Sequence, residues 1–283
     1  MKEKKIDRIL PSVGRLPTLP VIYAKLSQLL QAPNATIRVI SDVISEDPAT
    51  AAKVLRIVNS AFYGFPQRIG NVQRAVVILG LNEIKNLVLA TSILQVFRRF
   101  GSEHVFDMDR LWEHSIGCAV ASRVLAEAAY LRNPEDVFAG GLMHDIGKLI
   151  HAVSLPEKFA NVINEVHETG KPIIQAEEQI LGFNHAETGR ALAVKWHFPA
   201  ETVNMITRHH LDDASAELTK EIAAVHVGNT LCIALGLGSG GEKRVPVVDE
   251  KAWQILGLKL SQLEPIMARI EKLFKESTDI LRG

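Results

Sequence analysis

The chain has 283 residues, and 47% of them are hydrophobic, which is enough for one large domain or two domains of ordinary size and argues against global disorder. Lysine plus arginine and aspartate plus glutamate both number 32, so the formal net charge is zero. A balanced charge argues against a protein dedicated to nucleic acid or to an anionic membrane, because such proteins carry a basic excess.

Helical periodicity runs through the whole chain, and the apolar–polar alternation of a half-buried strand is hard to find. The first predicted helix follows the stiff stretch Leu16–Pro20. Thr36 and Asp47 are predicted to cap the next two helices, and Pro48 suits the first helical position after Asp47. The chain is therefore predicted to be all-α.

The segment Val58–Gly64 mixes aromatic residues with turn formers. It is either an exposed recognition loop or a helix end whose aromatic side chains pack back on the core, and the pattern favours the second. Two further helical patterns, Val72–Leu81 and Asn82–Phe100, complete this part of the chain.

The helical pattern breaks at Gly101-Ser102-Glu103, which is the best candidate boundary. We expect residues 1–101 to form an N-terminal helical subdomain. Residues 102–283 are then a second helical subdomain that ends in about two closing helices, so the protein is predicted to be a two-lobed helical bundle.

The second part opens with a predicted helix near Asp107 that carries His114. Asn133 followed by Pro134 and two acids is a strong helix start, with Asn as the cap. Later helices are predicted near 156–168 and 172–181, from a capping-box variant at Asn184–Glu187 through Trp196, from Phe198 to His210, and from Leu218 to Leu235.

An adjacent pair, His144-Asp145, lies inside what is predicted to be one apolar helical segment. An imidazole and a carboxylate in a core are costly unless something satisfies them, and a metal ion would bind one nitrogen and one oxygen. The alternative is a hydrogen-bonded core histidine beside a capped aspartate. Lys148 follows one turn after His144 and could attract a phosphate or another anion at the same place.

Ten histidines are present, and several lie near apolar stripes or helix ends on separate predicted helices. Helices of one bundle can aim such side chains at a common centre. Imidazoles with one carboxylate and no thiolate favour iron, zinc, nickel, cobalt or manganese over magnesium or calcium. The candidate ligands are His114, His144, Asp145, His185, His209 and His210, which predict either a bridged pair of ions or one ion with spare histidines. The remaining histidines are interpreted as surface or core residues: His104, His151, His167, His197 and His226.

The stretch Gly236–Gly241 lies between predicted helices and has neither a preceding strand nor a correctly spaced Lys-Ser/Thr pair. It is therefore not a phosphate-binding P-loop, and a flexible connection is expected.

The order of His114, His144-Asp145 and a downstream position resembles the HD superfamily of metal-dependent phosphohydrolases. His185 and the His209-His210 pair resemble the two-metal pattern of the HD-GYP phosphodiesterases. Motifs in the front half are similar to those of the HDOD family, the HD-related output domain of bacterial signalling proteins. The resemblance covers roughly residues 10–235. The motifs that carry this likeness are Leu16–Pro20, Asp47-Pro48, Val58–Gly64 and Ala75–Leu81.

Two positions depart from the resembling families. Asn229 stands where the last HD ligand is an aspartate, and it offers a carbonyl oxygen without the negative charge. The Gly-Tyr-Pro element expected after His209-His210 is missing. The resemblance implies a metal site made of His114, His144, Asp145, His185, His209, His210 and Asn229, with iron, manganese, nickel or zinc as one or two ions.

Two functions follow from the resemblance. The first is a regulatory module of bacterial signal transduction that binds a signalling protein or a small phosphorylated or nucleotide effector, with homo-oligomerisation left open. The second is a metal-dependent phosphohydrolase or phosphodiesterase in which Lys148 contacts the phosphate. Nucleic-acid binding has little support, because the basic residues are dispersed and no stacking platform is evident.

The two cysteines, Cys118 and Cys232, lie far apart in apolar segments and are expected to be core thiols in a reducing compartment. No apolar run reaches the length needed to span a bilayer. The charged stretch Met1–Lys5 is not followed by the apolar segment of a signal peptide. The protein is therefore expected to be cytoplasmic and not bound to a membrane.

Overall fold

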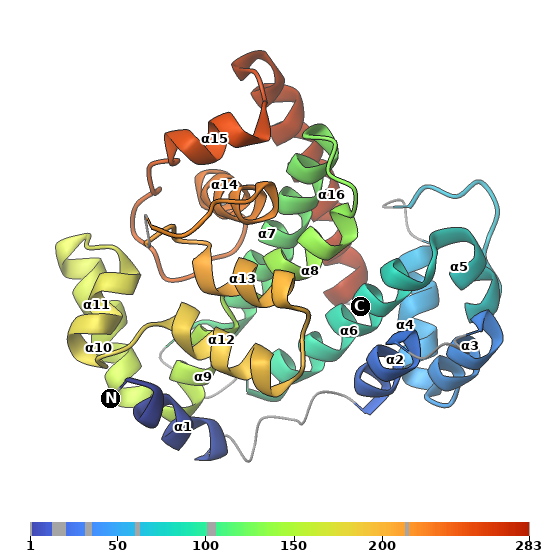
Figure 1. Ribbon diagram of the computed structural model, residues 1–283, viewed down its shortest axis with the longest axis horizontal. Helices are drawn as coiled ribbons and strands as arrows, with labels where there is room; N and C mark the ends of the chain where they lie inside the picture. Colours follow the sequence, from blue (N-terminus) through green and yellow to red (C-terminus); the bar gives the residue numbers. More distant parts are fainter. Residues whose placement is uncertain are drawn as a thin grey trace. The chain divides into compact units, whose positions relative to one another are not determined.

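The structure of the protein is a computed structural model that describes residues 2–12, 21–31, 36–59, 63–100, 106–212 and 215–282 (Figure 1). Within these ranges every regular element is a helix, which confirms the predicted all-α fold. No helix in the described part of the chain combines the length and the apolar character that a membrane crossing requires.

Contacts divide the chain into two compact units, and each unit is made of two separate stretches. The smaller unit comprises Pro17–Val96 and Lys272–Gly283, and the larger unit comprises Met1–Leu16 and Phe97–Glu271. Gly101–Glu103, where the sequence predicts the boundary, lie outside the described residues. The N-terminal stretch belongs to the larger unit and the C-terminal stretch to the smaller unit, and the sequence contains no signal for this assignment.

The smaller unit is made of helices. They are α2 (Val21–Gln31), α3 (Ile37–Ser45), α4 (Pro48–Val58), α5 (Val72–Leu79), most of α6 (Leu81–Phe100) and the end of α16 (Leu263–Arg282). Two of the predicted caps are confirmed, because the Thr36 hydroxyl accepts from the Val39 N–H at 3.3 Å and the Asp47 carboxylate accepts from the Ala49 N–H at 3.1 Å.

The segment after α4 is held by the Asn59 side chain. Its amide accepts from the Ile69 N–H at 2.7 Å and donates to the Ile69 carbonyl at 2.9 Å. Tyr63 is half-buried and its hydroxyl donates to the Glu83 carboxylate, so this aromatic residue packs back on the unit. Residues 60–62 of the same segment lie outside the described residues.

The larger unit contains the remaining helices. They are α1 (Lys2–Ser12), α7 (Met108–Ala128), α8 (Pro134–Met143), α9 (Ile146–Ser154), α10 (Pro156–Thr169), α11 (Ile173–Ile180), α12 (His185–Lys195), α13 (Ala200–Arg208), α14 (Lys220–Ala234), α15 (Glu250–Leu256), a 3₁₀ turn (Leu260–Gln262) and the start of α16.

Helix α7 is buried along most of its length and packs against α8 and α14 (Figure 1). Small side chains such as Cys118, Ala119 and Ser122 are buried on it, so the neighbouring backbones can approach closely. The predicted capping box of α12 is confirmed, because the Glu187 N–H donates to the Asn184 side chain at 2.9 Å and the Glu187 carboxylate accepts from the Asn184 N–H at 3.0 Å.

Two local expectations are corrected. Pro134 begins α8 as predicted, but the Asn133 side chain makes no capping hydrogen bond. The helix predicted to run through the His-Asp pair ends instead at Met143, and a new helix begins at Ile146. In an unbroken helix, adjacent side chains point in different directions, so the break allows His144 and Asp145 to face one place.

Candidate metal centre

The structure brings the predicted ligands of the larger unit into two adjoining groups, and within each group the donor atoms all lie within 4.8 Å of one another. The groups are His114, His144 and Asp145, and His185, His209 and His210. Every one of these side chains is fully buried except His210, which is half-buried. His114 comes from α7, His144 and Asp145 from the turn between α8 and α9, His185 from the start of α12, and His209 and His210 from the end of α13.

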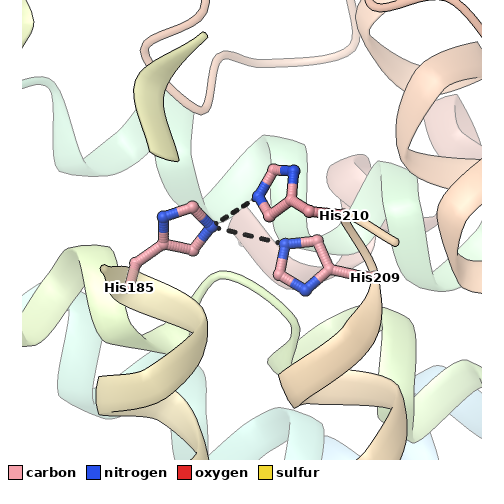
Figure 2. Close-up of side chains that lie close together, drawn as sticks. All are labelled: His185, His209 and His210. Carbon is pink, nitrogen blue, oxygen red and sulfur yellow. Dashed lines mark hydrogen bonds between the residues drawn. The ribbon is translucent and has the colours of Figure 1, made fainter. Parts of the chain in front are cut away.

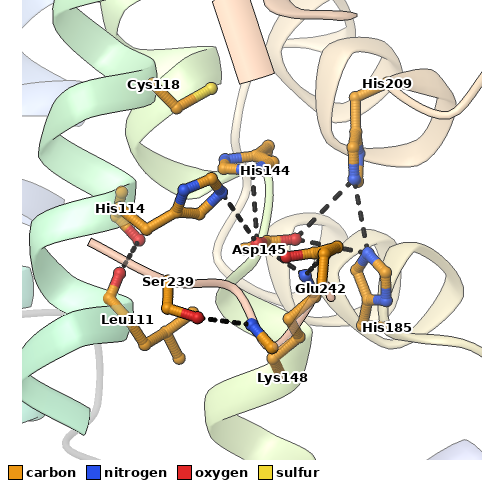
Figure 3. A network of polar contacts seen from close by, with 12 residues as sticks. Leu111, His114, Cys118, His144, Asp145, Lys148, His185, His209, Ser239 and Glu242 are labelled. Carbon is orange, nitrogen blue, oxygen red and sulfur yellow. Dashed lines mark hydrogen bonds and ion pairs between the residues drawn. The ribbon is translucent and has the colours of Figure 1, made fainter. Parts of the chain in front are cut away.

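Asp145 lies between the two groups, with each carboxylate oxygen facing one of them (Figure 3). Its Oδ2 is 3.5 Å from His114 Nε2 and 3.3 Å from His144 Nε2. Its Oδ1 is 3.3 Å from His185 Nε2 and 3.8 Å from His209 Nε2. A carboxylate in this position can join two ions or bind one ion on either side.

Backbone carbonyls fix the orientation of two of the imidazole rings. His144 Nδ1 lies 2.7 Å from the Gly141 carbonyl, and His209 Nδ1 lies 2.8 Å from the Ile206 carbonyl. A carbonyl oxygen can only accept, so each Nδ1 carries the proton and donates it. In both rings Nε2 therefore points toward Asp145, the orientation that metal-binding histidines adopt.

Glu177, from α11, fixes a third ring and was not identified from the sequence. Its carboxylate accepts from His185 Nδ1 at 2.6 Å and from the His185 N–H at 2.9 Å, and it also accepts from His151 Nδ1 at 3.0 Å. Burial alone would raise the pKa of Glu177, but His185 and His151 hold it far below its ordinary value, so the carboxylate is charged. No sequence signal separates Glu177 from its exposed neighbour Glu178, because burial on α11 decides between them.

The second histidine group has its Nε2 atoms crowded together (Figure 2). His185 Nε2 lies 2.8 Å from His210 Nε2 and 3.3 Å from His209 Nε2. His209 donates its Nδ1 proton to the Ile206 carbonyl, so its Nε2 faces His185 Nε2. Burial and neighbouring histidines lower the pKa of His209 and His210, which keeps both rings neutral. A cation at this place could be bound by the Nε2 atoms of the group.

The first group has buried nitrogen atoms without a hydrogen-bond partner among the described residues, His114 Nε2 and His144 Nε2, and Asp145 Oδ1 is in the same position. Burial lowers the pKa of His114 to about 4. Burial also acts to lower the pKa of His144, but the neighbouring Asp145 outweighs it and raises this pKa. The group therefore contains nitrogen and oxygen donors and calls for positive charge.

The remaining predicted ligand, Asn229, lies on α14, the helix that packs against α7. Its side chain is buried, and its amide oxygen has no hydrogen-bond partner in the described part of the chain. His226, on the same helix, donates from Nδ1 to the His209 carbonyl at 2.8 Å and thus holds the end of α13. His226 and His151 are hydrogen-bonded core histidines, and His167 and His197 are exposed, as interpreted from the sequence; His104 lies outside the described residues.

Lys148 is fully buried beside the first group and is already paired (Figure 3). Its Nζ lies 2.8 Å from Asp145 Oδ2 and 2.6 Å from Glu242 Oε1. Burial alone would lower the pKa of Lys148, but Asp145 and Glu242 raise it, so the ammonium is charged. The sequence predicted Lys148 as a contact for a phosphate or another anion, and the anion beside it in the structure is the protein's own Glu242.

Glu242 follows the glycine-rich stretch that was expected to be a flexible connection. The structure instead packs this loop against the centre, with the Ser239 N–H donating to the Arg110 carbonyl at 2.9 Å and Leu237 buried. Gly238 adopts a φ of 71° and lies against the backbone of His114, where a side chain would not fit. The glycines therefore permit close packing. Their number just before Glu242 is the one sequence signal that could have pointed to this residue.

Comparison with known proteins gives the family. The family model for the HDOD domain matches residues 16–211, which is more than half of the chain. The chain belongs to the HDOD family. The matched HDOD region includes both histidine groups and ends before Asn229 and Glu242.

Two solved HDOD-like structures resemble this chain closely in fold. The HDOD domain protein of unknown function from Geobacter sulfurreducens is 25% identical with a TM-score of 0.77, covering 96% of this chain and 99% of that one. A candidate phosphohydrolase from Shewanella amazonensis SB2B is also 25% identical, with a TM-score of 0.75, covering 96% and 97%.

A relative from Treponema pallidum (strain Nichols), named only as an uncharacterized protein, is 26% identical over 219 residues. The aligned region is 77% of this HDOD chain and 42% of the relative. The chain therefore spans less than half the length of that protein.

Proposed function

We propose that this chain is a regulatory HDOD module of bacterial signal transduction whose larger unit holds a metal centre for structural or effector-linked purposes. The observation that carries the proposal is the enclosure of the centre. His114, His144 and Asp145 are fully buried, and the Lys148 ammonium that could hold a phosphate is neutralised by two carboxylates of the chain. A hydrolytic site needs an open position for its substrate, and this arrangement supplies a closed one.

The residues of the centre fit a transition metal. His114 Nε2, His144 Nε2 and Asp145 Oδ1 have no hydrogen-bond partner among the described residues, and His185 Nε2 and His209 Nε2 face each other at 3.3 Å. These nitrogen and oxygen atoms can bind a metal ion. Imidazole-rich ligation with one carboxylate suits iron, manganese, nickel or zinc. Because Asp145 directs one oxygen to each group, the geometry accommodates one or two ions.

The chain's own residues prepare this centre. The Gly141 and Ile206 carbonyls and the Glu177 carboxylate accept the Nδ1 protons of His144, His209 and His185, and this directs each Nε2 toward the centre. When bound, a metal of this kind supplies Lewis acidity toward an oxygen ligand. The positive charge of Lys148 lies 2.8 Å from the negative charge of Asp145 and partly neutralises it.

The partner is proposed from the family resemblance: a signalling protein or a small phosphorylated or nucleotide effector, in the cytoplasm, with a homo-oligomer as an alternative assembly. A membrane or nucleic-acid partner is not proposed, because the net charge is zero and no helix of the described residues suits a membrane.

A second function, a metal-dependent phosphohydrolase, is favoured by one observation: each oxygen of Asp145 faces a separate histidine group. Paired ions joined by a carboxylate suit phosphate-ester chemistry. The resemblance to the Shewanella candidate phosphohydrolase supports the same alternative.

Metal analysis and an assay separate the two functions. We expect purified protein to contain a stoichiometric transition metal and to turn over bis(p-nitrophenyl) phosphate at no more than the metal-free background rate, with manganese or iron added. Turnover that requires the metal and disappears in His144→Ala would overturn the regulatory proposal in favour of the hydrolase. Protein that binds no transition metal after growth in supplemented medium would overturn the metal centre in both.

A further inference from the structure

The loop that ends at Glu242 places a second carboxylate beside the first histidine group. The Glu242 side chain is only 10% exposed, and its Oε1 is paired with Lys148. Its Oε2 is buried and has no hydrogen-bond partner among the described residues. An unpaired carboxylate oxygen in a core is costly, so this atom is poised for a partner that the chain itself does not supply.

Gly240 shows how close this oxygen lies to Asp145. A Cβ at Gly240 would lie 2.6 Å from Glu242 Oε2, 2.9 Å from Lys148 Nζ and 3.0 Å from Asp145 Oδ2. The two carboxylates and the ammonium therefore surround one small volume at the edge of the first group, and only a residue without a side chain can pass over it (Figure 3).

Formal charge gives this second carboxylate a reason to be there. Asp145 and Lys148 cancel each other, so without Glu242 the first histidine group offers a divalent cation no net negative charge. The last HD ligand position, an aspartate in the resembling phosphohydrolases, is the neutral Asn229 in this chain. Glu242 lies thirteen residues after Asn229, in the loop that follows α14 and outside the family match, and returns one negative charge to the first histidine group.

We propose that Glu242 is a carboxylate ligand of the metal centre at His114, His144 and Asp145, and that it supplies the charge that Asn229 lacks. The inference rests on the proposed metal centre. It adds a ligand from the glycine-rich loop, so that the loop both covers the centre and takes part in binding the ion. The competing role for Glu242 is simple neutralisation of Lys148, with no bond to the metal.

The test compares Lys148→Met with the double variant Lys148→Met/Glu242→Gln. Removing one positive and one negative group together keeps the net charge of the cluster as it is in the natural sequence, so the double variant is better suited to fold than either single variant. Metal-free proteins are titrated with cobalt(II) alone, and binding is followed by visible absorption, which reports both affinity and the ligands around the ion. Glu242→Gln alone is the second variant. The matched control is Glu250→Gln, which changes an exposed glutamate on the following helix. Circular dichroism checks the fold of each variant.

We expect Lys148→Met and Glu250→Gln to bind cobalt at least as tightly as the natural sequence. The double variant should bind at least tenfold more weakly than Lys148→Met, with a changed absorption spectrum, and Glu242→Gln should show the same loss. If the double variant binds as tightly as Lys148→Met with the same spectrum, Glu242 only neutralises Lys148 and the inference is wrong. If the natural sequence itself binds no cobalt, the metal centre is overturned and the ligand role of Glu242 falls with it.

Discussion

Gly147, in the first turn of α9, packs directly against the backbone of His185 at the start of α12. A Cβ at Gly147 would lie 2.7 Å from the His185 carbonyl carbon and 2.9 Å from its Cα, closer than real side-chain contacts come. The absence of a side chain at Gly147 therefore sets the distance between the turn that carries His144-Asp145 and the helix that carries His185.

Replacing Gly147 by alanine is expected to push α9 away from α12. The obstructing atoms belong to a backbone that cannot rotate away, so the free energy of unfolding should fall by roughly 2 to 3 kcal/mol. Metal affinity should fall as well, since His185 moves away from Asp145. The measurements are urea unfolding and cobalt titration. Gly70→Ala is the control, because a Cβ at Gly70 meets no atom within 4 Å, and equal effects of both changes would contradict the prediction.

Local chemistry explains what the sequence could predict about the fold. The caps at Thr36, Asp47 and Asn184 depend on residues a few positions apart, and the structure contains all three hydrogen-bond patterns. The break between Met143 and Ile146 has no proline, and the apolar pattern continues on both sides of it, so periodicity does not show it. Periodicity alone therefore predicted one helix where two occur.

The candidate centre divides in the same way. Histidine is informative wherever it occurs in an apolar segment, so the predicted ligands could be named before the helices were arranged. Glutamate is common on helix surfaces, and nothing in the sequence distinguishes Glu177 from its exposed neighbour Glu178. The glycine-rich loop before Glu242 was read as flexible because composition cannot separate glycines that allow motion from glycines that allow close approach.

Replacing Glu177 by glutamine tests the support of His185. A glutamine amide has only one oxygen, so it accepts less well than the carboxylate from the Nδ1 and the backbone N–H of His185. Its NH₂ group is a donor and would face His151 Nδ1, which now donates to the carboxylate. Metal affinity should fall about 10- to 100-fold, the usual effect of losing an acceptor behind a metal-binding histidine.

The matched control for that change is Glu178→Gln, at the next position of α11, where the side chain is 46% exposed and bonds Asn184 and Lys2. Cobalt titration of both variants, beside the natural sequence, gives the comparison. A Glu178→Gln loss as large as that of Glu177→Gln would contradict the special position of Glu177.

Removing the metal is expected to destabilise the larger unit. A ligand that binds only the folded state adds about 2.7 kcal/mol when its free concentration is one hundred times its dissociation constant. Thermal unfolding of protein stripped with a chelator should therefore begin at a lower temperature, and added metal should restore the midpoint. His144→Ala should unfold at the same temperature with or without metal. A midpoint that the chelator leaves unchanged in the natural sequence would show that no bound metal contributes to stability.

Replacing Asn229 by aspartate should tighten metal binding while weakening the metal-free protein. The amide oxygen of Asn229 is buried and without a hydrogen-bond partner among the described residues, so a carboxylate there brings an unpaired negative charge into the core. A divalent cation compensates this charge, and affinity should rise by roughly tenfold, or about 1.4 kcal/mol. The variant should therefore gain more stability from added metal than the natural sequence does.

Thermal unfolding with and without metal gives both quantities for Asn229→Asp. The control is Asn161→Asp, at an exposed position of α10, where the added charge stays in water and neither midpoint should move by more than a degree or so. A buried carboxylate at position 229 lowers the unfolding midpoint when no cation is near and raises it when a cation is bound beside it. The sign of the change in midpoint on adding metal therefore distinguishes the two cases. Destabilisation of Asn229→Asp that metal does not reverse would place this side chain outside the reach of the ion.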